Sequence, residues 1–269
     1  MAVIDTRHDA FDMARVVSRT FGAIGRNGAA FAVLALGLVA VPRSIVAILQ
    51  AQLIPLAASG AFFNLTPGTW LRYGELSLGV GLLNIVFAVL LQAAVIRIVV
   101  QDLNDERARI ADSLSAGLNV AVPVIFLGIL IWLGVLLGFI LFIVPGLMLA
   151  TRWIVAVPVR VMERQTVLGA MGRSAQLTSG HRWTIFALMF AYMVVVWVFS
   201  AVFGQLLVST LLTQPNALTH LASPPVLIFS ALISAATSIL AASGVAAIYC
   251  ELRGVKEGVA PSALAAIFD

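Results

Sequence analysis

The 68 residues between Arg182 and Glu251 contain no Asp, Glu, Lys or Arg. The hydrocarbon core of a bilayer, about 30 Å thick, is crossed by about 20 apolar residues in a helix. The stretch is therefore long enough for two transmembrane helices, and turn-forming residues at 213–216 and at Pro224–Pro225 can separate them. This feature predicts an all-α, polytopic helical membrane protein.

The composition of the whole chain agrees with this class. Hydrophobic residues make up 61% of the sequence and charged residues only 10%, whereas a soluble domain carries about 25% charged residues. The apolar runs are continuous, which disfavours a β-barrel with its alternating pattern. The segment 1–12 carries three aspartates and one arginine, unlike a secretory signal, so we expect the first apolar run to be retained as a span.

Charges and helix breakers predict about six transmembrane helices. The second lies in the 21 uncharged residues between Glu75 and Arg97. The third and fourth share an uncharged stretch of 39 residues, 113–151, which Pro145-Gly146 divides. Pro158 predicts a kink or a tilt in the fourth helix. The expected helices cover residues 28–53, 76–100, 120–144, 147–161, 183–212 and 226–252.

We expect one membrane domain, residues 1–269. It comprises an amphipathic N-terminal segment 1–27, a transmembrane region 28–252 and a C-terminal segment 253–269. Thirteen Lys and Arg residues fall on the side that holds both termini, and Arg72 alone falls on the other side. Positive charge favours cytoplasmic loops, so both termini are predicted to be cytoplasmic.

The first predicted cytoplasmic segment has the pattern of an interfacial helix. Within residues 11–25, Phe11, Ala14, Val17 and Phe21 share one face, and the arginines Arg15, Arg19 and Arg26 fall elsewhere. Such a helix is suited to the headgroup layer, where its arginines would attract anionic lipids.

Residues 110–120 and 167–178 repeat this amphipathic pattern, and each precedes a predicted pair of spans. The chain can therefore be divided into three units, each an interfacial helix followed by a transmembrane hairpin. We state this internal repeat as a hypothesis, beside the alternative that short cytoplasmic linkers tend to be amphipathic in any membrane protein.

Polar residues at membrane depth are the first place to look for function. Arg43 and Arg152 are the two charged candidates; either side chain can snorkel to the headgroups or serve as a buried functional charge. Trp153 beside Arg152 favours an interface anchor. The uncharged residues Gln50, Asn84 and Gln92 can hold helices together or line a polar path. We treat these six residues as candidate contacts for lipid or substrate.

The sequence offers no arrangement for catalysis. The three histidines have no metal-ligand spacing, and neither a G-x-S-x-G turn nor a phosphate-binding loop is present. Asp102 to Glu106 are interpreted as a solvated helix edge. We therefore expect no catalytic, metal or cofactor site, no enzymatic activity and no nucleic-acid partner.

The segment from Pro145 to Trp183 carries a more specific pattern. The residues that form it are Pro145-Gly146, Arg152, Pro158, Glu163, Ala170, Ser174, Leu177-Thr178, Gly180 and Trp183. This pattern resembles the glycerophosphoryl diester phosphodiesterase membrane-domain family and its YciC-like relatives. Tyr249 to Arg253 and the N-terminal residues 16–27 resemble the corresponding parts of that family.

The resemblance implies a bacterial inner-membrane protein with about six spans and without the catalytic phosphodiesterase domain. The matching residues near the fourth helix would lie at the cytoplasmic edge, where Ser174 and Thr178 would cap a helix or bond to backbone and Trp183 would anchor the fifth helix. The candidate cytoplasmic interface comprises Arg15, Arg19, Arg26, Glu163, Arg164, Arg173, Ser174 and Trp183.

Three functional hypotheses follow. The first is a non-enzymatic membrane protein that binds anionic phospholipid or organises lipid-handling partners. The second is a transporter or lipid translocator with a polar path near Arg43 and Arg152. The third is a membrane anchor for a separate soluble enzyme, which would dock on the cytoplasmic face along Arg160–Arg182 and the C-terminal segment.

Overall fold

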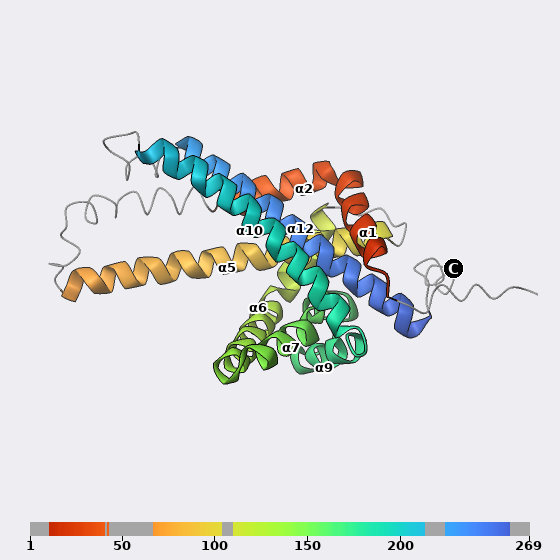
Figure 1. Ribbon diagram of the computed structural model, residues 1–269. Coiled ribbons are helices and arrows are strands. Elements are labelled where there is room, and N and C mark those ends of the chain that lie inside the picture. The colour runs from red at the N-terminus through yellow and green to blue at the C-terminus, as the bar shows by residue number, and fades with distance from the viewer. Residues whose placement is uncertain (1–10, 41, 43–66, 104–109, 213–223, 259–269) are drawn as a thin grey trace, which may run out of the picture. The chain divides into compact units, whose positions relative to one another are not determined.

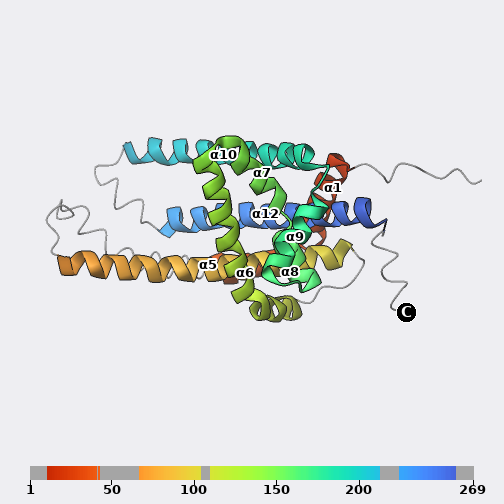
Figure 2. The same ribbon diagram turned by 90° about the horizontal axis from the view of Figure 1, so that it is seen from below.

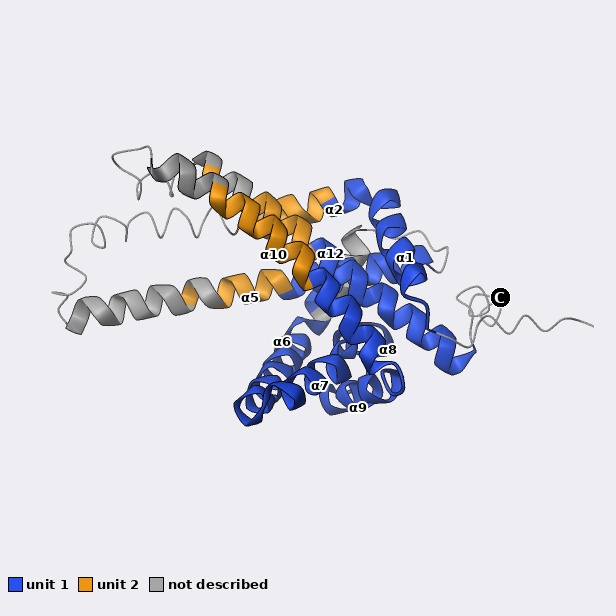
Figure 3. Cartoon of the chain, viewed as in Figure 1, with its two compact units in different colours: residues 1–31, 89–192, 239–269 blue, residues 32–88, 193–238 orange. Residues whose placement is uncertain are grey.

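Every element in the described part of the chain is helical. The computed structural model describes residues 11–40, 42, 67–103, 110–212 and 224–258 (Figure 1). The chain divides into two compact units (Figure 3). Unit 1 comprises Met1–Phe31, Val89–Tyr192 and Ile239–Asp269, and unit 2 comprises Ala32–Ala88 and Met193–Ser238.

Five helical segments among the described residues are long and apolar enough to cross a membrane. They are Leu82–Leu103, Val120–Leu141, Ile143–Glu163, Arg182–Gln205 and Ser230–Glu257. A bent pair, Met13–Arg26 with Gly28–Val39, raises the number to six if it is counted as one span. The predicted class, an all-α polytopic membrane protein, is confirmed. The expected first helix, 28–53, extends beyond the described residues.

The long helices cover the predicted spans and exceed several of them. Helix α5 is Pro67–Leu103, α10 is Arg182–Leu212 and α12 is Pro224–Glu257. The last helix continues past the expected end at residue 252. Residues 259–269, part of the predicted C-terminal segment, lie outside the described residues.

Helix α1, Met13–Arg26, is the first of the predicted interfacial helices. The side chain of Asp12 caps it by accepting hydrogen bonds from the backbone N–H groups of Ala14 and Arg15, which satisfies donors that a helix start leaves free. Asn27 interrupts the helix, and α2, Gly28–Ala35, follows with the π-helix η2, Leu36–Ala40. The bend between the two segments is 77°.

The second predicted interfacial helix is not separate. Residues 110–120 belong to the continuous helix α6, Ile110–Leu141. The helix continues without a break into the span, and Pro123, which removes one bond of the backbone ladder, lies inside it. The third is separate, because α9, Val167–Leu177, has its own N-cap, Thr166. The described residues therefore contain two of the three expected interfacial helices as independent elements.

Helices α6 and α7, Ile143–Trp153, form a tight hairpin in unit 1, and α7 turns back beside α6 (Figure 2). The expected break at Pro145-Gly146 is wrong by three residues. The extended residue Phe142, with φ −165° and ψ 160°, alone separates the helices. Pro145 lies in the first turn of α7, where the missing N–H removes no intrahelical hydrogen bond.

Small residues let the two backbones of this hairpin approach closely. A Cβ on Gly138 would lie 2.8 Å from the Cα of Gly146, and one on Gly134 would lie 2.6 Å from the ring of Trp153. The earlier residue of α6, Gly134, meets the later residue of α7, Trp153, so the two helices run antiparallel. Gly134 and Gly138 therefore allow the close approach, whereas Gly128 has nothing within 4 Å of an added Cβ.

The fourth predicted span is interrupted, as Pro158 suggested. Helix α7 ends at Trp153, and α8, Ala156–Glu163, begins after a two-residue turn and carries Pro158 in its first turn. The 11 residues of α7 rise about 16 Å, about half the thickness of a bilayer core. Span length is reached only when α7 and α8 are taken together.

The core of unit 1 includes the last third of α5. Leu91, Ala94, Val95, Ile96 and Ile98 are each at most 2% exposed. In unit 2, by contrast, large apolar side chains of α10 are exposed; Trp197, for example, is 72% exposed. Exposed apolar surface of this size suits contact with lipid.

The packing of the hairpin predicts that two Gly→Ala substitutions in α6 change the free energy of unfolding by different amounts. Gly138→Ala places a methyl group against the Gly146 backbone and should lower the free energy of unfolding by about 1–3 kcal/mol. Gly128→Ala meets no neighbour and should leave it unchanged or raise it by up to about 1 kcal/mol through helix propensity. Unfolding by SDS in mixed micelles measures both, and equal effects would contradict the packing.

Candidate functional site

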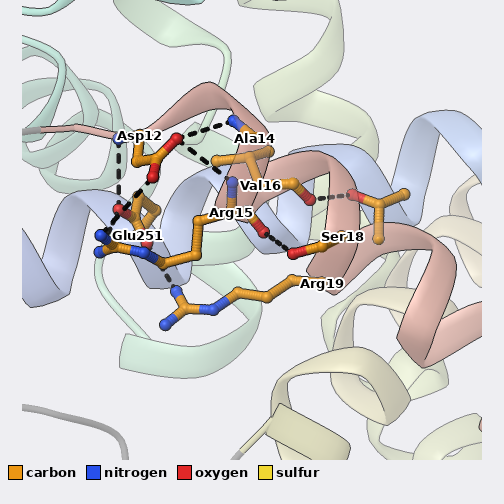
Figure 4. A network of polar contacts seen from close by, with 8 residues as sticks. Asp12, Ala14, Arg15, Val16, Ser18, Arg19 and Glu251 are labelled. Carbon is orange, nitrogen blue, oxygen red and sulfur yellow. Dashed lines mark hydrogen bonds and ion pairs between the residues drawn. The ribbon is translucent and has the colours of Figure 1, made fainter.

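The most distinctive polar group of unit 1 is the carboxylate of Glu251 in α12, whose side chain is 2% exposed. Arg15 Nη1 donates to Glu251 Oε1 at 2.9 Å, and Arg19 Nη1 donates to Glu251 Oε2 at 2.7 Å (Figure 4). The backbone N–H of Asp12 adds a third bond at 3.4 Å. A buried carboxylate is costly without such partners, so Glu251 fixes α1 against α12.

A second group of polar contacts lies on a different face of the same helix end. Tyr249, Arg253 and Glu257 are spaced by four residues and share a face, while Glu251 lies about 200° around the helix from Tyr249. Tyr249 Oη donates to Glu163 Oε1 at 2.9 Å. Arg253 Nε donates to Glu257 Oε2 at 2.9 Å. We call four residues of α12 the α12 polar segment: Tyr249, Glu251, Arg253 and Glu257.

Arg173 of α9 completes this second group. Its Nε donates to Glu163 Oε2 at 3.3 Å, and its guanidinium pairs with Glu257. Helices α8 and α9 are therefore attached to one face of the α12 polar segment, and α1 is attached to the other.

Where the fourth span is interrupted, side chains of α9 supply hydrogen bonds to a backbone carbonyl at the end of α7. Ser174 Oγ, fully buried, donates to the backbone carbonyl of Arg152 at 2.9 Å. Thr178 Oγ1 donates to the carbonyl of Ser174 at 2.9 Å and also lies 3.3 Å from the carbonyl of Arg152. A helix end leaves its last carbonyls without intrahelical partners. The expectation that Ser174 and Thr178 bond to backbone is confirmed.

Arg26 and Asp102 form a further link, between α1 and the end of α5. The guanidinium of Arg26 donates to both carboxylate oxygens, with Nη2 to Oδ2 at 2.6 Å. The side chain of Asp102 is 14% exposed. The expectation of a solvated helix edge is therefore wrong for Asp102; residues 104–109 lie outside the described part.

At the start of α1, Phe11 stacks on His181 with ring centroids 5.7 Å apart. His181 lies in the turn before α10, and Gly180 precedes it with φ 84°. Burial of His181, and secondarily the charge of Lys256, lower the pKa of its imidazole below the ordinary value. The neutral ring is thus favoured in the stacked arrangement.

The candidate contacts at membrane depth that the structure describes belong to two helices, α5 and α7. Arg43 and Gln50 lie outside them. Asn84 is in the unit 2 part of α5, whereas Gln92 is in the unit 1 part; both are partly buried. Arg152 is exposed, and the ring of Trp153 packs on Gly134. The polar path stays a hypothesis from the sequence.

The candidate cytoplasmic residues have three kinds of surroundings. Arg15, Arg19, Arg26, Glu163 and Arg173 form ion pairs, and Ser174 is buried against Arg152. Arg164 ends α8 in a left-handed conformation, φ 52°, and is exposed. Trp183 is 80% exposed at the start of α10. Their predicted roles as an interface stay predictions.

Sequence reasoning included Tyr249 to Arg253 in the family pattern but assigned no site role to Tyr249, Glu251 or Glu257. The i, i+4 spacing of Arg15 and Arg19 and the position of Glu251 at the end of the uncharged stretch were the available signals. No group of three or more His, Cys, Asp and Glu suited to a metal ion occurs in the part of the chain that the structure describes.

These features define a polytopic helical membrane protein whose helices are joined at one end of unit 1 by ion pairs; among the described residues, only the Glu251 carboxylate of these pairs is fully buried. Residues 127–257 match the family model described as the membrane domain of glycerophosphoryl diester phosphodiesterase. This segment, from within α6 to the end of α12, is therefore similar to that membrane domain, and the resemblance found from Pro145 to Trp183 is confirmed. The match does not include residues 16–27. No curated protein and no solved structure matches the chain.

The Glu251 cluster predicts an order of stabilities. Replacing both Arg15 and Arg19 by Gln leaves a buried carboxylate unpaired and should lower the free energy of unfolding by about 3 kcal/mol or more. Glu251→Gln should cost less, because the side chains of Arg15 and Arg19 are 30% and 26% exposed and can be hydrated.

Adding Glu251→Gln to the double arginine variant should restore part of the lost stability, which a mutant cycle in detergent measures. Arg164→Gln, at an exposed site, is the control for loss of positive charge. Simple additivity of the three changes would show that Glu251 does not depend on the arginines.

Proposed function

We propose that the chain is a non-enzymatic protein of the bacterial inner membrane, with both termini cytoplasmic, that engages phospholipid through helix α1. One observation carries the proposal. Met13, Val17 and Phe21, spaced by four residues on α1, are 44%, 44% and 59% exposed. The family match supports a membrane setting for residues 127–257.

The direction of α1 supports its placement in the headgroup layer. The following segment, Gly28–Val39, is bent by 77° from α1. If that segment enters the bilayer close to its normal, α1 lies nearly parallel to the surface. Its exposed apolar face can then enter the boundary between headgroups and acyl chains, while its buried residues, Val16, Thr20 and Ala23, hold it to unit 1.

Two further exposed apolar side chains of unit 1 support the same setting. Trp183, the second residue of α10, is 80% exposed, and Leu168 on α9 is 73% exposed. Tryptophan is enriched at membrane interfaces because its ring is amphipathic. Both side chains are suited to contact lipid near the end of unit 1 where α1 is held.

Site-specific quenching tests whether α1 contacts lipid. The single cysteine, Cys250, is buried, so Cys250→Ser provides a background for one labelled cysteine at position 21. In nanodiscs, an environment-sensitive fluorophore there should be quenched by lipids spin-labelled just below the headgroup, because the side chain at this position faces lipid.

The control is a cysteine at Gln165, an exposed polar residue between α8 and α9, which should be quenched at least about threefold less. Equal, weak quenching at both positions would reject the placement of α1 in the lipid.

A second function is favoured by the family description, which names a phosphodiesterase. In this alternative the chain anchors a separate soluble enzyme that acts on glycerophosphoryl diesters, through the exposed turn at Arg164 and Gln165. The tagged protein should then co-purify with glycerophosphodiesterase activity, and Arg164→Glu with Gln165→Glu should reduce that activity at least about fivefold because both side chains are exposed. Purification without activity would exclude this role.

A further inference from the structure

Among the described side chains of unit 1, every carboxylate is paired with an arginine, but some arginines have no carboxylate partner. Each carboxylate whose side chain is described is engaged by arginine; these carboxylates are Asp12, Asp102, Glu163, Glu251 and Glu257. Their partners are Arg15, Arg19, Arg26, Arg173 and Arg253. The arginines that sequence reasoning assigned to anionic lipid are thus largely neutralised by the protein itself.

A different set of arginines is left without an acidic partner among the described residues. Three of them, Arg97, Arg160 and Arg182, have a buried Nε that makes no hydrogen bond. Each side chain remains partly exposed, so the rest of its guanidinium can be reached from outside. The Nε atoms are closed to solvent, so an anion would bind the remaining guanidinium N–H groups, which are strong donors to phosphate oxygens.

These three arginines lie toward the same end of unit 1. Arg97 is five residues before Asp102, which pairs with Arg26 of α1. Arg160 is one turn before Glu163, which pairs with Tyr249 of α12. Arg182 follows His181, whose ring stacks on Phe11 beside α1. The contacts of α1 and α12 therefore tie the three helix ends together.

The same positions are near the ends of candidate spans. Arg97 lies in the last two turns of Leu82–Leu103, Arg160 lies in the last turn of Ile143–Glu163, and Arg182 begins Arg182–Gln205. Lipid phosphates are found at this level of a bilayer, and guanidinium is the side-chain group best suited to phosphate oxygens.

We propose that Arg97, Arg160 and Arg182 bind the phosphate groups of anionic phospholipids at this end of unit 1. The inference rests on the proposed function, because it requires this end to lie at the membrane surface. The arginines that contact lipid differ from those expected from the sequence. Arg15, Arg19 and Arg26 hold α1 in place, and the arginines without carboxylate partners recognise the headgroups.

Native mass spectrometry of the full chain, released from nanodiscs of phosphatidylglycerol and phosphatidylethanolamine, tests this assignment. Each of Arg97→Gln, Arg160→Gln and Arg182→Gln should reduce retained phosphatidylglycerol about fivefold, and the triple variant more. Arg164→Gln removes the same charge at an exposed position and should retain the lipid of the unaltered protein. Equal retention in the triple and control variants would overturn the proposal.

Lysine substitutions at the same three positions guard against a folding defect. They keep the charge but not the fork of the guanidinium, so retention should fall between that of the Gln variants and that of the unaltered protein. If all Gln and Lys variants fold and keep full retention, the three arginines do not bind headgroups.

Two further experiments distinguish lipid phosphate from soluble phosphate, and the arginine assignment from the proposed function. Millimolar inorganic phosphate should not stabilise the protein in purely zwitterionic lipid; stabilisation that Arg164→Gln keeps and the triple variant loses would indicate a site for soluble phosphate instead.

The fluorophore at position 21 should stay quenched in the triple variant. Quenching with unchanged lipid retention would reject only the arginine assignment, whereas absent quenching would reject the proposed function.

Discussion

The burial of one carboxylate organises unit 1. Glu251 is almost inaccessible, and its two oxygens are satisfied by two arginines that lie one turn apart on α1. An unpaired carboxylate in this position would oppose folding by several kcal/mol. The pairing therefore requires α1 to lie against α12, and the opposite face of the α12 polar segment requires α8 and α9 to do the same. Helices from three separate parts of the sequence, α1, the adjacent pair α8 and α9, and α12, are positioned by charges that fall within two turns of α12.

The spans could be predicted because membrane insertion depends on length and hydrophobicity, which are properties of a single segment. The hairpin and the interruption before Pro158 were also expected, since proline and glycine restrict the backbone locally. The position of the turn was not predictable in the same way. Phe142 is an apolar residue inside an uncharged run, and nothing in its local sequence marks it as the extended residue before α7.

The candidate site was less accessible from sequence. The arginines of α1 were evident as a basic face, but the partner of Arg15 and Arg19 lies more than 200 residues away and that of Arg26 lies 76 residues away. No local pattern indicates such pairings. Ser174 and Thr178 were recognised as backbone-bonding residues because hydroxyls commonly play that role. That both hydroxyls meet the carbonyl of Arg152 depends on the interruption of the fourth span, which brings α9 to the end of α7.

The one-residue connection between α6 and α7 has a consequence for how the protein is made. A segment of 11 residues is too short to be recognised as a span by itself, and Phe142 provides no loop that could be translocated independently. Helix α7 is therefore expected to enter the bilayer already folded back on α6, so that the two helices integrate as one hairpin. The biosynthetic insertion of this region would then be a single event, completed only after α8 has emerged from the ribosome.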